Sequence, residues 1–335
     1  MADEPSLPRD VTPISLATPF AIGRVNAYLL EGDPLTLVDP GPLMDGGLAQ
    51  LEAVLGERGL AIEDVEQVLL THQHHDHVGL AETVRESSGG AVAAIGPLAE
   101  YMSDVDRSLD MDDRYAVATM LRHGVEEQVA TTLRELTLAY RRFVASARVE
   151  RRLADGDSLA AGGRELKVLA RPGHSPTDTV FHDPSDGLLI AGDHLLQEVS
   201  SNPVAHWPVG EEDPEWAALS ADRRRPLVEY LDSLRRTSEL DVSLVLPGHG
   251  RPFVDHRGVV EGRERMHARR ARKILSELDA WSTAADVGRS LWRSVPVSQA
   301  YLVLSEVLGH VDLLEAEGLV REREDGDLAR LERTG

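Results

Sequence analysis

The sequence predicts a layered α/β fold. Three observations lead to this expectation. Apolar β-forming runs alternate with amphipathic helical segments, turn-forming residues separate these runs, and polar residues directly follow several of the predicted strands. Layered α/β folds place their sites at such strand ends. With 335 residues, of which 42% are hydrophobic and 27% charged, the chain can also bury a sizeable core.

The first hundred or so residues carry most of the strand and helix signals. Residues 25–38 contain two apolar runs on either side of the turn cluster Gly32-Asp33-Pro34, which is the pattern of two joined strands. Residues 48–58 have their leucines and valine on one helical face, between glycines. The elements expected next are a buried strand over 65–70, a helix from residue 80 to about 86 and a strand over 91–95.

Residues from 97 to about 150 have long helical periodicity and little strand signal, so they are interpreted as a helical insertion. Their tyrosines and methionines are expected to pack between helices, with a lid over a substrate as the alternative. Beyond the insertion we expect four strands and one long helix, namely strands over 165–169, 179–182, 188–191 and 243–246 and a helix near 214–236.

The composition changes after about residue 257, which divides the chain into regions 1–256 and 257–335. A basic helix over 261–278 leads to a Ser282-Thr283 cap, a short helix, a helix over 298–317 and a hairpin about Asp325-Gly326. Helices followed by a two-stranded wing predict a winged-helix-like end domain. The helix over 298–317 carries several acids and no lysine or arginine, so packing or dimerisation is favoured over contact with nucleic acid.

The stretch THQHHDHVGL, residues 71–80, is a metal site, a histidine-rich polar loop or a low-complexity tract. His72 and His74 are two positions apart, and on a helix they would point about 200° away from each other. On a bent loop that leaves a strand, both can converge on one ion. Asp76 and His77 lie further round the same loop and can face a second ion. The loop therefore offers two incomplete half-sites.

Three further polar residues supply what the loop lacks. His174 lies in RPGHSP, Asp193 in LLIAGDHLL and His249 in LVLPGHG. Each follows a predicted buried strand and an adjacent glycine, where the backbone can bend and bring the side chain to a shared cleft. Together with the loop they make seven candidate ligands, which suffice for two ions if Asp193 bridges them.

The motifs HQHHDH, PGHSP, AGDH and LPGHG, in this order, resemble those of the metallo-β-lactamase-fold hydrolases, above all the branch that includes glyoxalase II. LVDPG at residues 37–41 is similar to the early aspartate motif of that superfamily. AGDHLLQEVSSNP, followed by the winged-helix-like region, resembles bacterial hydrolases with a β-lactamase-associated winged helix. The resemblance covers residues 13–255 and implies an αββα sandwich with its site at one edge.

The resemblance also implies roles for these residues. His72, His74 and His174 would hold one metal ion, Asp76, His77 and His249 would hold the other, and Asp193 would bridge them. A hydroxide between the two ions would be the nucleophile, and Asp76 would take part in catalysis as well as in binding. Asp39 and His194 are expected to support ligands or to contact the substrate. The cofactor is expected to be two divalent ions, zinc first, with iron or manganese as alternatives.

These features predict an enzyme that hydrolyses a small ester, thioester or lactone. The alternatives are a phosphodiesterase or ribonuclease, and a mononuclear iron persulfide dioxygenase. A net charge of −22 disfavours a nucleic-acid partner, and no apolar run is long enough to span a bilayer. Cysteine is absent and the first 25 residues lack the features of a signal peptide, so a cytoplasmic location is expected.

Overall fold

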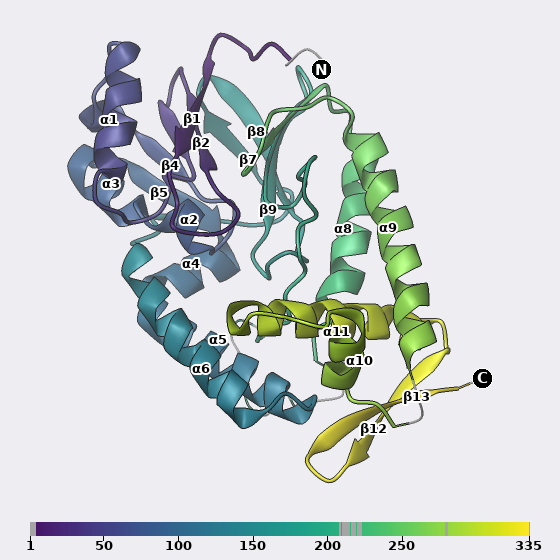
Figure 1. The fold of residues 1–335 in the computed structure, drawn as a ribbon. Coiled ribbons are helices and arrows are strands. Elements are labelled where there is room, and N and C mark those ends of the chain that lie inside the picture. Colours follow the sequence, from purple (N-terminus) through teal and green to yellow (C-terminus); the bar gives the residue numbers. More distant parts are fainter. Residues whose placement is uncertain are drawn as a thin grey trace.

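The computed structural model describes residues 5–207, 209, 215, 219, 223–278 and 281–334. Two β-sheets lie face to face, and helices cover the outer side of each, so that the chain forms an αββα sandwich as predicted (Figure 1). A pair of long helices and a C-terminal group of helices with a hairpin lie below the sandwich in this view. Within the described ranges, no helix is both long and apolar enough to cross a membrane.

The first sheet contains six strands in chain order, antiparallel from β1 to β3 and parallel from β3 to β6. Side chains of β2 alternate between the two faces, with Leu29 toward the outer helices and Leu30 toward the second sheet. The strands are β1 (Val11–Leu16), β2 (Val25–Leu30), β3 (Thr36–Val38), β4 (Gln67–Leu69), β5 (Ala91–Ile95) and β6 (Arg151–Leu153). The outer helices are α1 (Gly47–Glu57), α3 (Ala81–Ser88) and α4 (Gly96–Ser103), with a 3-10 turn at Ile62–Asp64.

The second sheet has the order β11-β10-β9-β8-β7, and only its β10–β11 pair is parallel. Ile190 of β10 packs between the sheets, whereas its neighbour Leu189 packs against the outer helices. The strands are β7 (Ser158–Ala161), β8 (Arg164–Ala170), β9 (Thr179–Asp183), β10 (Leu188–Gly192) and β11 (Leu244–Pro247). The outer helices are α8 (Pro226–Ser238) and α9 (His256–Glu277).

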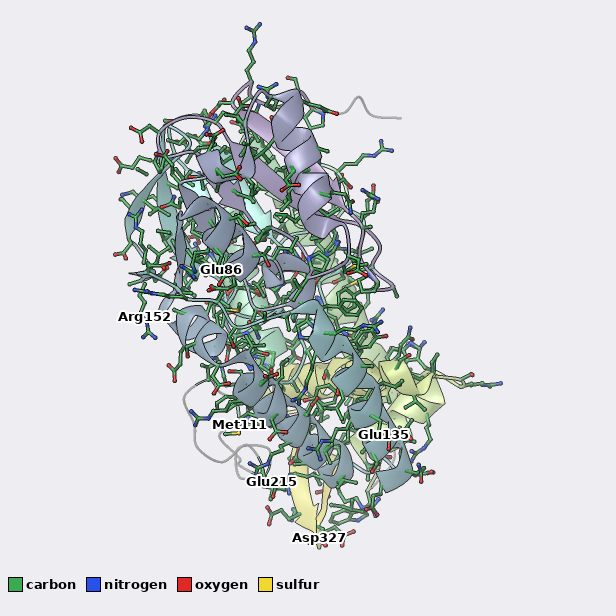
Figure 2. All side chains as sticks on the ribbon, turned by 90° about the vertical axis from the view of Figure 1, so that its left-hand side faces the viewer. Glu86, Met111, Glu135, Arg152, Glu215 and Asp327 are labelled. Carbon is green, nitrogen blue, oxygen red and sulfur yellow. The ribbon has the colours of Figure 1, made fainter. Side chains whose placement is uncertain are left out.

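The insertion is helical, as predicted, and it shares a core with the C-terminal region. Met120 and Leu133 of the insertion pack in one cluster with Ile274 of α9 and Val307 of α11. In the side view of Figure 2, Met111 and Glu135 mark α5 and α6, and Asp327 marks the tip of the hairpin. The elements are α5 (Val105–Arg122), α6 (Glu127–Tyr140), a 3-10 turn at Arg141–Phe143, α10 (Ala284–Leu291), a 3-10 turn at Val297–Gln299, α11 (Ala300–Ala316), β12 (Val320–Asp325) and β13 (Leu328–Arg333).

The structure corrects several predicted boundaries. A bent loop was expected to continue to residue 80, but α2 (His75–Val78) begins inside it. The expected long helix near 214–236 corresponds to α8, which begins at Pro226; most of 214–222 lies outside the described residues. α9 begins five residues before the expected start, because the Asp255 side chain accepts a hydrogen bond from Gly258 N and caps it. The division into regions 1–256 and 257–335 stays a prediction.

Candidate metal centre

The histidine motif lies at the edge of the sandwich where several parallel strands end. β4 ends at Leu69, and His72 and His74 follow in non-helical backbone. His74 is the N-cap of α2, so Asp76 and His77 lie on the first turn of a helix. The extended backbone turns into the helix at this point, which brings both parts of the motif to one place. The convergence predicted for a bent loop is therefore achieved by a loop and a short helix.

The other predicted ligands reach the same edge from the second sheet. β10 and β11 run parallel, so Asp193 and His249 follow strand ends that lie side by side. His174 lies in the connection between β8 and β9. Glycines permit the close approach at two points: Gly192 has a φ of +49°, and a Cβ on Gly248 would lie 2.3 Å from Asp193 Oδ1.

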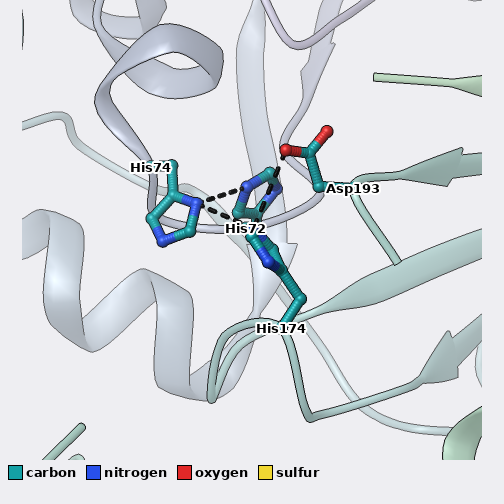
Figure 3. Close-up of side chains that lie close together, drawn as sticks. All are labelled: His72, His74, His174 and Asp193. Carbon is teal, nitrogen blue, oxygen red and sulfur yellow. Dashed lines mark hydrogen bonds and ion pairs between the residues drawn. The ribbon is translucent and has the colours of Figure 1, made fainter. Parts of the chain in front are cut away.

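One half of the centre consists of three imidazoles and a carboxylate, whose ligand atoms all lie within 4.8 Å of one another: His72, His74, His174 and Asp193. Figure 3 shows the rings and the carboxylate converging on a common point. His74 Nδ1 lies 3.0 Å from both His72 Nε2 and His174 Nε2. Asp193 Oδ2 lies 3.7 Å from His174 Nε2.

The other half consists of Asp76, His77 and His249. His249 Nε2 lies 3.3 Å from Asp76 Oδ2 and 3.4 Å from Asp193 Oδ2. The second oxygen of Asp193, Oδ1, lies 3.4 Å from His77 Nε2. Asp193 thus lies next to imidazoles of both halves.

Hydrogen bonds on the outer side of the centre orient four of the five imidazoles. The Nδ1 atoms of His249 and His174 lie 2.8 and 3.2 Å from backbone carbonyls, those of Arg24 and Asn202. His72 Nδ1 lies 3.0 Å from Thr71 Oγ1. Nδ1 is therefore occupied outside and Nε2 faces inward, as in metal-binding histidines held by outer partners.

Asp39 lies on the outer side of the centre, against His77 and Thr71. One carboxylate oxygen lies 2.9 Å from His77 Nδ1 and accepts a hydrogen bond of 2.7 Å from Thr71 Oγ1. The other oxygen accepts one of 2.9 Å from Thr71 N. Asp39 has a φ of +49°, and the parallel pairing of β3 with β4 sets its carboxylate beside the start of the histidine motif. It therefore orients His77 and the backbone before His72.

Buried polar atoms show that the donor set suits cations. His77 Nε2 and Asp193 Oδ1 are buried, and neither finds a hydrogen-bond partner among the described residues. Imidazole nitrogen and carboxylate oxygen are ligands of zinc and of other first-row divalent ions. The inward-facing atoms therefore fit metal ions better than they fit each other.

The pKa values divide the centre into two electrostatic parts. Burial lowers the pKa of His72 well below its ordinary value, and burial together with His174 lowers that of His74 to about 3. These imidazoles are therefore neutral, as metal ligation requires. Burial opposes charge on His249 as well, but Asp193 and Asp76 outweigh it and raise its pKa to about 9.

The carboxylates in the second part are ionised. Burial alone would raise the pKa of Asp193, but His77 and His249 lower it well below its ordinary value. The pKa of His77 is correspondingly raised well above its ordinary value by Asp193 and Asp76, against the effect of burial. This half of the centre therefore favours positive charge at the position where its side chains meet.

Not every expected histidine faces the centre. His194 is buried, and its Nε2 lies 2.9 Å from Thr237 Oγ1 in α8, away from the cavity beside the ligands. Its side chain therefore links the segment after β10 to α8. His75 and His206, in contrast, both line that cavity.

A cavity of about 390 Å³ opens beside the ligands His74, Asp76 and His174. Its opposite wall comes from the helical insertion, with one tyrosine from α11 and a segment after Asp193. The wall residues from these three parts are Tyr101, Leu109, Asp112, Asp113, Ala116, Thr137, Tyr140, Arg141, Val204, Ala205, His206 and Tyr301. The insertion therefore faces the metal ligands directly. Tyr101, for which packing between helices and a lid over a substrate were both considered, lies in the cavity wall.

Two supporting residues gave no recognised signal in the sequence. Asn26 donates hydrogen bonds from Nδ2 to the carbonyls of Pro247 and Gly250, and so holds the loop of His249. Asp178 accepts hydrogen bonds from Ser175 N and Oγ and fixes the loop of His174. Both are polar residues in or beside a buried strand, a pattern that could have indicated a role in holding a loop.

The chain was compared with known proteins. The family model of the metallo-beta-lactamase superfamily matches residues 21–249. The probable metallo-hydrolase YqjP of Bacillus subtilis is 32% identical over 323 residues, which cover 95% of this chain and 96% of that protein. Among solved structures, the metallo-beta-lactamase family protein TTHA1429 of Thermus thermophilus has a TM-score of 0.77 at 28% identity, covering 98% of this chain and 100% of that one. A beta-lactamase domain protein of Burkholderia ambifaria has the same TM-score at 26% identity, covering 99% and 94%. The chain therefore belongs to the metallo-beta-lactamase superfamily and is a metal-dependent hydrolase.

Proposed function

We propose that the chain is a dinuclear enzyme that hydrolyses a small ester, thioester or lactone. The observation that carries this proposal is the position of Asp193. Its Oδ1 lies 3.4 Å from His77 Nε2, and its Oδ2 lies 3.4 Å from His249 Nε2 and 3.7 Å from His174 Nε2. A carboxylate between two groups of imidazoles supports a pair of ions, zinc first and iron or manganese otherwise.

The ions would supply a Lewis acid and a water molecule of lowered pKa. The chain's own residues hold this chemistry in place. His72, His74 and His174 would bind one ion, and Asp76, His77 and His249 the other. Asp39 keeps the Nε2 atom of His77 directed inward by accepting a hydrogen bond from Nδ1. Burial of the centre excludes bulk water and strengthens the charge interactions within it.

The cavity supports a small acyl substrate. Its volume of about 390 Å³ is at the lower end of small-molecule sites, which range over about 300–1,000 Å³. Acidic side chains, Asp112 and Asp113, lie in the wall opposite the ligands, which disfavours a phosphodiester chain. The complete set of Asp76, His77 and His249 favours a dinuclear centre over a mononuclear iron dioxygenase.

Metal content and substrate range test the proposal together. Protein purified without added metal is analysed for bound elements, reloaded with zinc, iron or manganese, and assayed with matched esters, thioesters, lactones and phosphodiesters. We expect two ions per chain and turnover of an acyl substrate. Asp76→Ala should lose one ion and most activity, whereas Asp45→Ala, at an exposed aspartate, should change neither. One ion at full activity, with Asp76→Ala harmless, would refute the dinuclear proposal.

A further inference from the structure

The cavity wall opposite the metal ligands is built by two helices of the insertion. Leu109, Asp112 and Ala116 of α5 follow one another at three- and four-residue spacing, so they lie on the same helical face. Thr137 near the end of α6, and Arg141 just after it, join them. A substrate whose reacting bond lies at the metal ligands would therefore place its remote end against this wall.

Most hydroxyl donors in this wall already have acceptors in the protein. Tyr101 Oη donates a hydrogen bond of 2.8 Å to Asp112 Oδ2. Tyr301 Oη donates one of 2.5 Å to the carbonyl of Ala205. Thr137 Oγ1 donates one of 2.7 Å to Asp113 Oδ1. These three hydroxyls therefore have no donor left for a ligand, although their oxygens can still accept a hydrogen bond.

The positive charge in the wall is also neutralised. Arg141 Nη2 lies 2.5 Å from Asp113 Oδ2 and 3.9 Å from Asp110 Oδ1. Asp113 pairs with Arg141, whereas Asp112 makes no ion pair of its own with any residue that the structure describes. Arg141 Nε is buried and has no partner among the described residues, so an anionic group on the substrate is the competing occupant.

Two acceptors in the cavity remain available. In the described part of the chain, Tyr101 is the hydrogen-bond partner of Asp112 and occupies one oxygen, Oδ2. His206 Nε2 is buried and has no partner among the described residues, and Nδ1 lies 3.2 Å from the carbonyl of Trp207. Nδ1 therefore carries the proton, and Nε2 is left as an acceptor. Burial raises the pKa of the Asp112 carboxyl to about 7, and the hydrogen bond from Tyr101 and the nearby charge of Arg141 offset this effect only in part.

We propose that the substrate carries a primary ammonium group at the end remote from the scissile bond, and that Asp112 binds this group. The ammonium would supply the positive charge that the wall lacks, and one of its three N–H groups would donate a hydrogen bond to the free oxygen of Asp112. His206 Nε2 offers a further acceptor for the same substrate. The inference deepens the proposed hydrolytic function by naming the class of acyl substrate.

Binding is measured in the absence of turnover. The protein is loaded with metal, so that Asp76 and Asp193 bind the ions and are not available to the ammonium probe. Hexylammonium and hexanol are titrated by calorimetry at about pH 8, where Asp112 is ionised and the amine is protonated. We expect hexylammonium to bind Asp112→Asn about 10- to 100-fold more weakly than the unaltered protein, and hexanol to bind both alike. The matched control is Asp106→Asn, which removes the same charge from an exposed position of the same helix outside the cavity lining and should bind both probes normally. Equal hexylammonium binding by Asp112→Asn and the unaltered protein would overturn the inference.

Turnover provides the second measurement. Aminohexanoate, hexanoate and adipate esters of one alcohol differ only in an ammonium, methyl or carboxylate end. We expect the highest kcat/KM for the ammonium-ended ester, and Asp112→Asn should abolish this preference through KM while the hexanoate ester is unaffected. A preference for the carboxylate-ended ester, lost in Arg141→Gln, would overturn the inference in favour of anion recognition. If none of the esters is cleaved, the proposed function fails, and the binding measurement still decides on Asp112.

Discussion

Replacing Asp39 by asparagine tests whether the supporting hydrogen bonds control metal binding. The carboxylate has donors on both oxygens: His77 Nδ1 and Thr71 Oγ1 face one, and Thr71 N faces the other. An asparagine amide must direct its NH2 group at one of these donors. If it faces His77, the imidazole is driven to the tautomer whose proton is on Nε2, the atom that should bind metal. Asparagine tolerates the positive φ of this position about as well as aspartate, so the backbone should be unchanged.

The magnitude follows from the contacts that are lost. Removal of a partner that orients a metal-bound histidine lowers metal affinity by about 10- to 100-fold, which is about 1.4–2.8 kcal/mol. Because Asp39 contacts His77 directly and His72 only through Thr71, the larger loss should occur in the half of the centre that contains His77. The assay is a zinc titration against a competing chelator, resolved into two sites. Asp45→Asn makes the same chemical change at an exposed position and is the control. If Asp39→Asn binds two ions with unaltered affinity, the supporting role of Asp39 is refuted.

Three other predictions concern the bridge, pH and the C-terminal region. Asp193→Asn should lower turnover by at least about 100-fold in folded protein and release the ion at His77 before the other ion, because the half with His72, His74 and His174 keeps three imidazoles. Turnover and metal content are measured side by side, and near-normal values for both would disprove a bridging role of Asp193. Zinc affinity should rise with pH at least as far as about 9, because the ion must displace a proton from His249 below that pH and a further proton from His77, whose pKa is also raised. Chelator competition across this range measures it, and a flat profile would contradict it. Deletion of residues 257–335 should expose Met120 and its apolar neighbours in the insertion and cause aggregation, which light scattering would detect. A monodisperse, fully active truncated protein would argue against a shared core.

Much of the candidate centre could be predicted because its signals are local. Each ligand follows a short apolar run and a bend, so the sequence around His174, Asp193 or His249 already indicates a strand end. What local patterns do not contain is the pairing of strands. The parallel alignment of β10 with β11 brings Asp193 beside His249, and this follows only from the complete sandwich.

The cavity wall could not be predicted in the same way. Asp112 lies in an amphipathic helix and Arg141 directly after one, and charged residues in such segments are most often solvated. Their position opposite the ligands depends on how α5 and α6 pack against the sandwich and on α11. Short elements were missed for a related reason: β1 (Val11–Leu16) contains a proline, and α2 has only four residues, so neither has enough periodicity to be recognised.

The packing of α11 supports the proposal that the C-terminal region acts structurally and does not bind nucleic acid. A recognition helix must present an exposed, basic face to the groove of DNA. Within α11, whose residues are all described, only Leu302 and Ala316 are exposed. A Cβ added to Gly309 would lie 2.8 Å from Leu227 Cβ, so this face of α11 packs closely against α8, and Asp312 is held by Arg223 through a buried ion pair of 2.6 Å. Because Tyr301 of the same helix lines the cavity and bonds to Ala205, α11 holds part of the cavity wall in position, and the C-terminal region thereby completes the site.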